Sequence, residues 1–263
     1  MFSKKNIKYL ENSEPKRYNY GIGRYLGLGL GAFFGVMIIT AFLSIILYII
    51  FNGTDKFLEL AKNLQKITGD KNFLYLSMIA QVMVETLAVV LIVILIRKDL
   101  AGDAKDTRNK LWAKIGFVLG GAVSMPVLLL LVDIIYKKLG ISTSSENQDI
   151  LEALIKGDQK IVMFFSVVIL APIYEELVYR KLIGGFLAKT RSPKILNFVI
   201  VSLVFAFIHV QSEIFELKFA PLFPYLLISM VVTGVYYLTN ENIYASMIVH
   251  FLNNLLAFVA LVS

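Results

Sequence analysis

The chain has 263 residues, of which 57% are hydrophobic and 17% are charged, and its formal net charge is +7. This balance excludes an ordinary soluble domain and indicates a polytopic membrane protein. The sequence contains no cysteine, which excludes disulfides and thiolate chemistry. We attribute the positive charge to loops that face anionic lipid, and not to nucleic-acid binding.

Seven apolar runs approach or exceed the roughly 20 residues that a helix needs to span the hydrocarbon core. They cover residues 27–51, 73–96, 112–136, 161–188, 195–212, 219–238 and 243–262. The first is too long for a signal-peptide core, so we expect a retained transmembrane helix. The sequence thus predicts an all-α membrane bundle of about seven transmembrane helices. Eight is the alternative, because a short or re-entrant segment could precede the proline-interrupted sixth run.

Lysine and arginine predict the orientation of the bundle. With the N-terminus in the cytoplasm, the cytoplasmic segments carry 15 of these residues and the opposite side carries 9. We therefore expect a cytoplasmic N-terminus. Residues 54–70 and 144–160 read as amphipathic helices on the membrane surface.

Small residues form a stripe in the first run, where Gly23, Gly27, Gly31 and Gly35 recur at four-residue spacing. Such a stripe lets another helix backbone approach closely. We expect it to pack within the fold, with a dimer interface as the alternative.

Charges inside the fourth run need an explanation, because charged side chains in a membrane helix are costly and usually pair. The stretch APIYEELVYR contains Glu175, Glu176 and Arg180. Glu176 and Arg180 are four residues apart and share a helix face, which favours an ion pair. Glu175 points about 100° away and has no such charged neighbour. It is either a catalytic base or a bridge to another helix.

Only two histidines occur in the chain, and both lie in apolar runs. His209 follows Phe205 by four residues, and His250 precedes Asn254 by four, so each pair shares a helix face. A lone intramembrane histidine more often joins helices. Two of them, with an aligned amide and an unpaired carboxylate, supply the parts for attacking a peptide carbonyl with water.

The ordered motifs Glu-Glu-x-x-x-Arg, Phe-x-x-x-His and His-x-x-x-Asn resemble those of the CPBP family of intramembrane proteases. This family is also called Abi or CAAX amino-terminal protease and includes the CAAX prenyl endopeptidase of eukaryotes. The resemblance implies three regions. They are a cytoplasmic segment at 1–26, variable N-terminal helices with amphipathic loops at 27–160, and a catalytic membrane domain at 161–263.

The resemblance also implies roles for the site residues. Glu175, aided by His209, deprotonates a water, while His250 and Asn254 donate hydrogen bonds to the oxyanion. Glu176 and Arg180 hold the helix and Glu175 in place. Alternatively, Glu175, His209 and His250 could bind a divalent metal such as zinc, which needs about three protein ligands. The sequence leaves the metal and metal-free mechanisms open.

The sequence contains no motif of the zincin, serine or aspartyl classes of hydrolase. His-Glu-x-x-His, Gly-x-Ser-x-Gly and Gly-x-Gly-Asp are all absent. For Glu85 and Asp133, two further charges in or near apolar runs, we favour structural pairing. Glu85 could pair with an arginine or line the cavity. The depths of Glu175 and His250 along their helices place the site nearer the cytoplasm, with His209 deeper unless tilt brings it level.

The leading hypothesis is an endopeptidase that cuts a membrane-associated peptide or protein. The chain has 20 lysines but only 6 arginines, which indicates an AT-rich bacterium and a location in its plasma membrane. The resemblance then implies processing of secreted peptides or self-immunity to a bacteriocin. The alternative is a non-catalytic membrane scaffold that regulates a partner such as a sensor kinase, and degraded motifs would favour it. A proton-relaying transporter would show an internal repeat, and the sequence has none.

Overall fold

The structure, a computed structural model, describes residues 18–63, 69–141, 145–157 and 159–263. Most of the expected cytoplasmic segment at 1–26, and residues 64–68, 144 and 158 of the expected amphipathic segments, lie outside these ranges. Every regular element within them is helical, which confirms the predicted all-α bundle.

Within the described residues, five helices are long and apolar enough to cross a membrane, and two shorter apolar helices accompany them. The long ones are Ile22–Asn52, Lys71–Leu95, Leu111–Leu139, Lys160–Lys189 and Ile243–Val262, and the shorter ones are Lys194–His209 and Leu222–Leu238. They correspond one to one to the seven predicted runs. The possible eighth segment is a five-residue helix, Gln211–Phe215, and not a further span.

Two of the spans are subdivided. The first consists of α2 (Ile22–Leu30), the π-helical η1 (Gly31–Gly35) and α3 (Val36–Asn52). The fourth consists of α10 (Lys160–Met163), η2 (Phe164–Leu170), α11 (Ala171–Glu175), η3 (Glu176–Ile183) and α12 (Gly184–Lys189), with η2 and η3 π-helical. The other spans are α6 (Lys71–Leu95), α8 (Leu111–Leu139), α13 (Lys194–His209), α15 (Leu222–Leu238) and α16 (Ile243–Val262).

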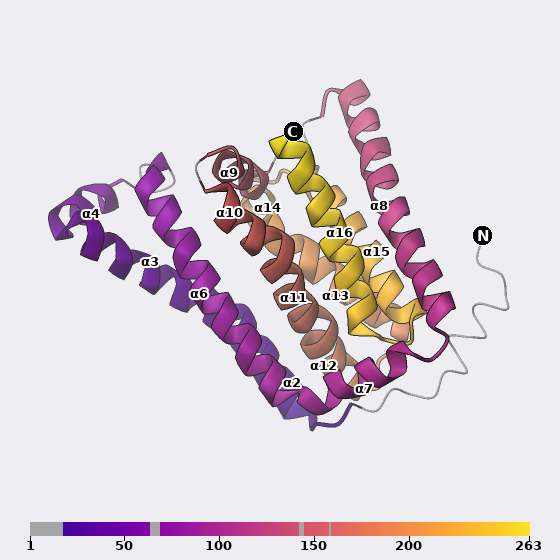
Figure 1. Cartoon of the computed structure of the whole chain (residues 1–263). Coiled ribbons are helices and arrows are strands. Elements are labelled where there is room, and N and C mark those ends of the chain that lie inside the picture. The colour runs from indigo at the N-terminus through magenta and orange to yellow at the C-terminus, as the bar shows by residue number, and fades with distance from the viewer. Residues whose placement is uncertain (1–17, 64–68, 142–144, 158) are drawn as a thin grey trace.

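Short polar helices lie at the two ends of the bundle: α4 (Thr54–Ala61), α7 (Arg97–Thr107), α9 (Glu146–Ile155) and α14 (Gln211–Phe215). Figure 1 shows α7 crossing one end of the bundle, with α9 and α14 at the opposite end. α4 and α9 fall in the two segments predicted to be amphipathic. α7 falls in a polar segment between two predicted spans, for which no helix was predicted.

The fourth span and α16 run side by side through the bundle, with α13 and α15 behind them in the view of Figure 1. α8 packs against α15 and α16 on one side, while α3 pairs with α6 on the other. The three predicted motifs therefore lie on neighbouring helices.

Local capping explains where several helices begin and end. The Asp70 carboxylate accepts a hydrogen bond from the Phe73 N–H at 2.8 Å and starts α6. The Ser145 hydroxyl accepts one from the Gln148 N–H at 3.2 Å and starts α9. α8 ends at Gly140, whose φ of 67° is left-handed and suits glycine.

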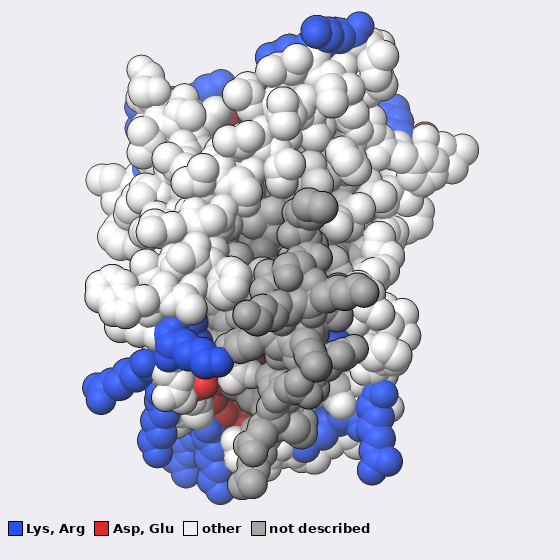
Figure 2. Space-filling view, turned by 90° about the vertical axis from the view of Figure 1, so that its right-hand side faces the viewer, with Lys and Arg blue, Asp and Glu red and all other residues white. Residues whose placement is uncertain are grey.

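The outer surface of the bundle is apolar between its two ends. Figure 2 shows one face with Lys and Arg gathered at both ends, most densely at the lower one, where α7 lies, and a band of other residues between them. Large apolar side chains such as Phe42, Leu87 and Val123 are exposed on the surface of the protein. Exposure of so many apolar side chains in water would favour aggregation, whereas lipid covers them in a membrane.

The structure contradicts the predicted packing of the glycine stripe within the fold. A Cβ at Gly23, Gly27, Gly31 or Gly35 would have no described heavy atom within 4 Å, so the expected packing within the fold is wrong. The buried face of the helix is the one that carries Gly29, where an added Cβ would lie 3.6 Å from the Leu182 Cβ. The four-residue spacing was right for a helix face, but that face is not the one turned inward.

We predict that the α7 end of the bundle faces the cytoplasm, because positively charged loops are retained there. Single cysteines replacing exposed Lys105 on α7 and Lys138 at the far end of α8 test this prediction, since the native chain has no cysteine. An impermeant maleimide should label the Lys138→Cys variant in intact cells and the Lys105→Cys variant only after permeabilisation. The reverse pattern would show an inverted orientation.

Candidate active site

The three predicted motifs converge on the Glu175 carboxylate. Its Oε1 lies 3.7 Å from Nε2 of His209, and its Oε2 lies 3.6 Å from Nε2 of His250. These separations exceed a direct hydrogen bond and lie in the range where a water can mediate the contact. The two carboxylate oxygens thus face two different imidazoles, which come from α13 and α16.

Glu176 is fully buried and has two partners. Its Oε1 lies 2.9 Å from Nη1 of Arg180, so the predicted ion pair is present. The same oxygen lies 2.9 Å from Nδ1 of His250. Because an ionised carboxylate only accepts, the His250 Nδ1–H is the donor, and this bond fixes the tautomer and turns Nε2 toward Glu175. The sequence analysis missed this contact, since no spacing rule links residues that are 74 positions apart.

Arg180 joins the site to two more helices. Its Nη2 lies 3.2 Å from the Ser229 hydroxyl and 3.3 Å from the Thr233 hydroxyl, both on α15. The guanidinium also lies over the Phe205 ring of α13, 5.0 Å from its centroid, where a cation–π attraction operates. Arg180 therefore satisfies a buried charge and ties the fourth span to α13 and α15.

His209 is held between two aromatic rings. It stacks on Phe205 at 4.4 Å and on Tyr225 at 4.9 Å between ring centroids. Its Nδ1–H donates to the Phe205 carbonyl at 2.7 Å, because a carbonyl only accepts, and Nε2 is then turned toward Glu175. Phe205 also meets His250 edge-on at 5.9 Å, so this one ring sets the spacing of both imidazoles.

Asn254 is used differently from what the resemblance implies. Its Nδ2 donates to the Val167 carbonyl of η2 at 2.9 Å, and its Oδ1 accepts from Asn253 at 3.1 Å. The side chain thus ties α16 to the fourth span one turn beyond His250. A role at an oxyanion depends on the second N–H of the same amide group.

The reacting and supporting groups differ in exposure. The side chains of Glu175 and His209 are each 17% exposed, whereas those of Glu176 and Arg180 are fully buried. Glu175 Oε2 accepts no hydrogen bond from the described protein atoms. Oε2 itself is buried, and a buried carboxylate oxygen without a protein partner, in a side chain that is 17% exposed, is suited to bind a reactant.

The backbone of the fourth span departs from the regular α-helix assumed in the sequence analysis. Glu175 ends the one-turn α11, and the π-helical η3 begins at Glu176, with η2 directly before α11. π-helical turns are frequent at functional sites. They also change which backbone carbonyls accept hydrogen bonds within the helix. The Val167 carbonyl in η2 accepts from the Asn254 side chain.

Glu85 and Asp133 have different partners in the structure. Asp133 pairs with Lys137 at 2.7 Å on the surface, as expected. Glu85 is buried on α6, and its Oε1 accepts from Gln81 Nε2 at 2.8 Å, so its hydrogen bond is not with an arginine. Its charge interacts with that of Glu175 and with Tyr174. Glu85 is thus a neighbour of the site on α6.

The donor set does not fit a metal centre in this structure. Among the described residues, no group of three or more His, Asp or Glu side chains could hold a metal ion. The two Nδ1 atoms are engaged with Phe205 and Glu176, and each Nε2 faces a different oxygen of Glu175. The ring nitrogens and the Glu175 oxygens thus face one another and not a common point where a metal ion could bind.

Two cavities, of about 480 and 910 Å³, lie at the α7 end and beside α9 and α14. Neither is lined by Glu175, His209 or His250. An opening of the site toward the cytoplasm stays a prediction.

The apolar helices and the apolar outer surface define the class of the protein, a multi-pass membrane protein. The family model described as type II CAAX prenyl endopeptidase Rce1-like matches residues 157–256, which contain all three motifs. The match confirms the resemblance read from the motifs and supports a membrane protease in general. No curated protein and no solved structure matches the chain.

We predict that Arg180→Ala destabilises the protein as well as inactivating it. The substitution leaves Glu176 buried without its cationic partner, and breaking a buried pair typically costs about 3–5 kcal/mol. Arg180→Lys should recover only part of the loss, because lysine lacks the planar guanidinium group that contacts Glu176 and α15 at the same time.

The measurement is the thermal unfolding of the purified protein in detergent. Lys137→Ala, which breaks the exposed pair with Asp133, is the control and should leave the unfolding temperature nearly unchanged. An Arg180→Ala curve that overlays the wild type would contradict the structural role of Arg180.

Proposed function

We propose that the chain is an endopeptidase in which Glu175 activates a water molecule to hydrolyse a peptide bond of a membrane-associated peptide or protein. The observation that carries this proposal is the position of the Glu175 carboxylate, 3.6 and 3.7 Å from two imidazoles on other helices. The match to the Rce1-like family model supports protease activity in general.

In the first step, Glu175 accepts a proton from a water that lies against Oε1 and His209 Nε2. The oxygen of this water adds to the carbonyl carbon of the peptide bond, and the carbonyl oxygen becomes an oxyanion. His209 is well suited to orient the water, because the stacking and the Nδ1–H hydrogen bond hold its ring in a single orientation.

His250 stabilises the oxyanion in this scheme. When the ring carries a proton on both nitrogens, Nδ1–H remains bonded to Glu176 and Nε2–H can donate to the developing charge. Glu176 then has the role of a carboxylate that orients an imidazole and stabilises its cation. The second N–H of Asn254 is the further donor that the family resemblance implies.

In the second step, the proton held by Glu175 passes to the nitrogen of the leaving amine, and the carbon–nitrogen bond breaks. The products are a peptide with a new carboxyl terminus and a peptide with a new amino terminus. Glu175 is returned to its ionised form, so the cycle consumes only water.

We predict that Glu175→Gln abolishes peptide cleavage while abundance and thermal stability stay near the wild type. Glutamine keeps the shape of the side chain but cannot accept the proton of the water. His209→Ala should lower the rate by about 10²-fold or more, in line with the loss of one positioned catalytic group. Full activity of either variant at matched expression would remove the role assigned to that residue.

The proposed chemistry also predicts resistance to chelators. Activity of the detergent-purified protein should persist after treatment with a strong zinc chelator and removal of the chelate. A loss of activity that added zinc restores would favour the metal-dependent alternative.

Processing of secreted peptides or self-immunity to a bacteriocin is our proposal for the biological role. It follows from the bacterial composition of the chain and from the resemblance of its motifs. The test compares the membrane peptidomes of cells that express the wild type and the Glu175→Gln variant. A product present only with the wild type identifies the substrate, whereas identical peptidomes with a retained phenotype would favour the non-catalytic scaffold.

A further inference from the structure

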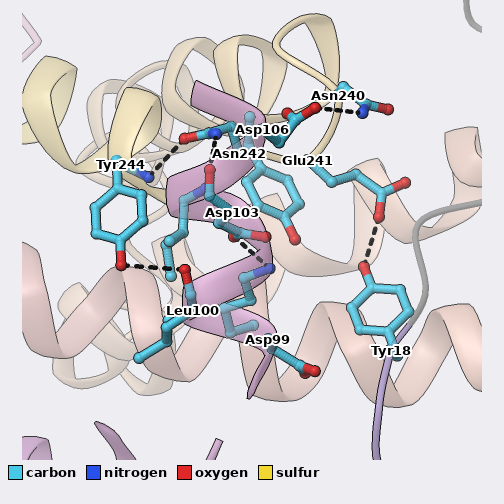
Figure 3. Close-up of polar contacts among 12 residues, drawn as sticks. Tyr18, Asp99, Leu100, Asp103, Asp106, Asn240, Glu241, Asn242 and Tyr244 are labelled. Carbon is cyan, nitrogen blue, oxygen red and sulfur yellow. Dashed lines mark hydrogen bonds and ion pairs between the residues drawn. The ribbon is translucent and has the colours of Figure 1, made fainter. Parts of the chain in front are cut away.

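A cluster of buried polar side chains lies at the α7 end of the bundle, away from the catalytic groups. Figure 3 shows α7 crossing this region with Asp103 directed toward the start of α16. Asp103 has no exposed surface, which is unusual for a carboxylate at the end of a membrane bundle. Its contacts with two of the three helices that carry the catalytic motifs give it a specific role.

The first contact is with the fourth span. Asp103 Oδ2 lies 2.5 Å from Nζ of Lys181, which directly follows Arg180 and is also buried. The Lys181 ammonium lies 5.8 Å from the Tyr18 ring centroid and 5.9 Å from that of Tyr236. A buried ammonium needs a counter-charge, and Asp103 supplies it.

The second contact is with α16. The same Oδ2 accepts a hydrogen bond from the Ile243 N–H at 3.2 Å, and the Asp103 carbonyl accepts one from Asn242 Nδ2 at 2.8 Å. Asn242 is the N-cap of α16, because its Oδ1 accepts from the N–H groups of Tyr244 and Ala245. A carboxylate at this position also meets the positive end of the helix dipole.

Other residues of α7 strengthen this junction. Tyr244 donates to the Leu100 carbonyl at 3.3 Å, and Asn242 Nδ2 also donates to the Thr107 hydroxyl at 3.1 Å. The turn before α16 contains Asn240 and Glu241 with left-handed φ angles of 64° and 56°. This conformation is uncommon outside glycine and lets α16 begin beneath α7, with Ile243 buried.

The two contacts of Asp103 close a ring of interactions. At the active site, Glu176 of the fourth span binds His250 of α16. Five residues beyond Glu176, Lys181 binds Asp103, and Asp103 binds Ile243, which lies about 10 Å along α16 from His250. The fourth span and α16 are therefore joined at this end of the bundle as well as at His250 and Asn254, and Asp103 contacts both helices here.

We propose that Asp103 is a positioning residue that sets α16 against the fourth span and thereby holds His250 Nδ1 against Glu176. It also accounts for the level of His250 in the bundle. His209 lies at the last position of α13, whereas His250 lies only seven residues after the first position of α16, yet both reach Glu175. The recessed start of α16 beneath α7 brings the two imidazoles level.

Histidine nuclear magnetic resonance tests this proposal directly, because the chain contains only two histidines. The protein is produced with nitrogen-15-labelled histidine and reconstituted in detergent. Glu176→Gln is the reference variant, because it removes the charge on the acceptor of the His250 Nδ1–H bond. Asp103→Ala should shift the His250 ring signals in the same direction as this variant does, or broaden them. The His209 signals should change less, since its ring is held by Phe205 and Tyr225.

Asp133→Asn serves as the matched control, because it removes an exposed carboxylate that is paired with a lysine four residues away. It should leave both sets of signals at their wild-type positions. Asp103→Asn keeps an oxygen that can accept from the Ile243 N–H but loses the charge opposite Lys181, and we expect an intermediate shift. If Asp103→Ala fails to fold, Asp103→Asn carries the test. His250 signals that overlay the wild type in a folded Asp103 variant overturn the proposal.

The catalytic consequence rests on the proposed function and is measured separately. With a cleavable peptide, Asp103→Ala should lower kcat by about 10²-fold, the loss typical of a small misplacement of a catalytic group, with KM little changed. A higher KM with unchanged kcat would overturn the positioning role. A shifted His250 signal in a protein whose wild type cleaves no peptide would leave Asp103 as the positioning residue and remove the proposed function instead.

Discussion

The Glu176 carboxylate, shared between Arg180 and His250, is the interaction on which the rest of the site depends. Its Oε1 lies 2.9 Å from both partners, and the carboxylate is fully buried. A buried charge of this kind is tolerated only when its partners are close and well oriented. The network therefore determines how the fourth span, α13, α15 and α16 pack, because Arg180 also reaches Ser229 and lies over the Phe205 ring.

This arrangement separates support from reaction. Behind Glu175, charges are paired and buried, which keeps the positions of the groups constant. The Glu175 side chain is 17% exposed, and its buried Oε2 has no hydrogen-bond donor among the described protein atoms. Catalysis by water activation needs both conditions, since a mobile base loses its orientation and a fully paired one cannot accept a proton. The Asp103 junction, at the α7 end, extends the support beyond the site itself.

Hydropathy and motif spacing predicted what depends on local sequence: the seven apolar helices, the pair of Glu176 with Arg180, and the three helices that carry Glu175, His209 and His250. They could not predict contacts set by tertiary packing. The bond between Glu176 and His250 was missed, and so was α7, whose buried side carries Asp99 and Asp103 and a single apolar residue, Leu100. The Gly27 and Gly31 face was assigned to packing, although Gly29 is on the inward side. The π-helical turns in the fourth span have no recognised spacing signal.

The central claim is that water, activated by Glu175, is the nucleophile. The most direct measurement is a single turnover of the substrate peptide in water enriched in oxygen-18, with mass spectrometry of the products and of the protein. The account predicts one oxygen-18 atom in the new carboxyl terminus and none in Glu175. Product without the label, together with oxygen-18 in the Glu175 carboxylate, would show that this carboxylate attacked the carbonyl itself and would contradict the account.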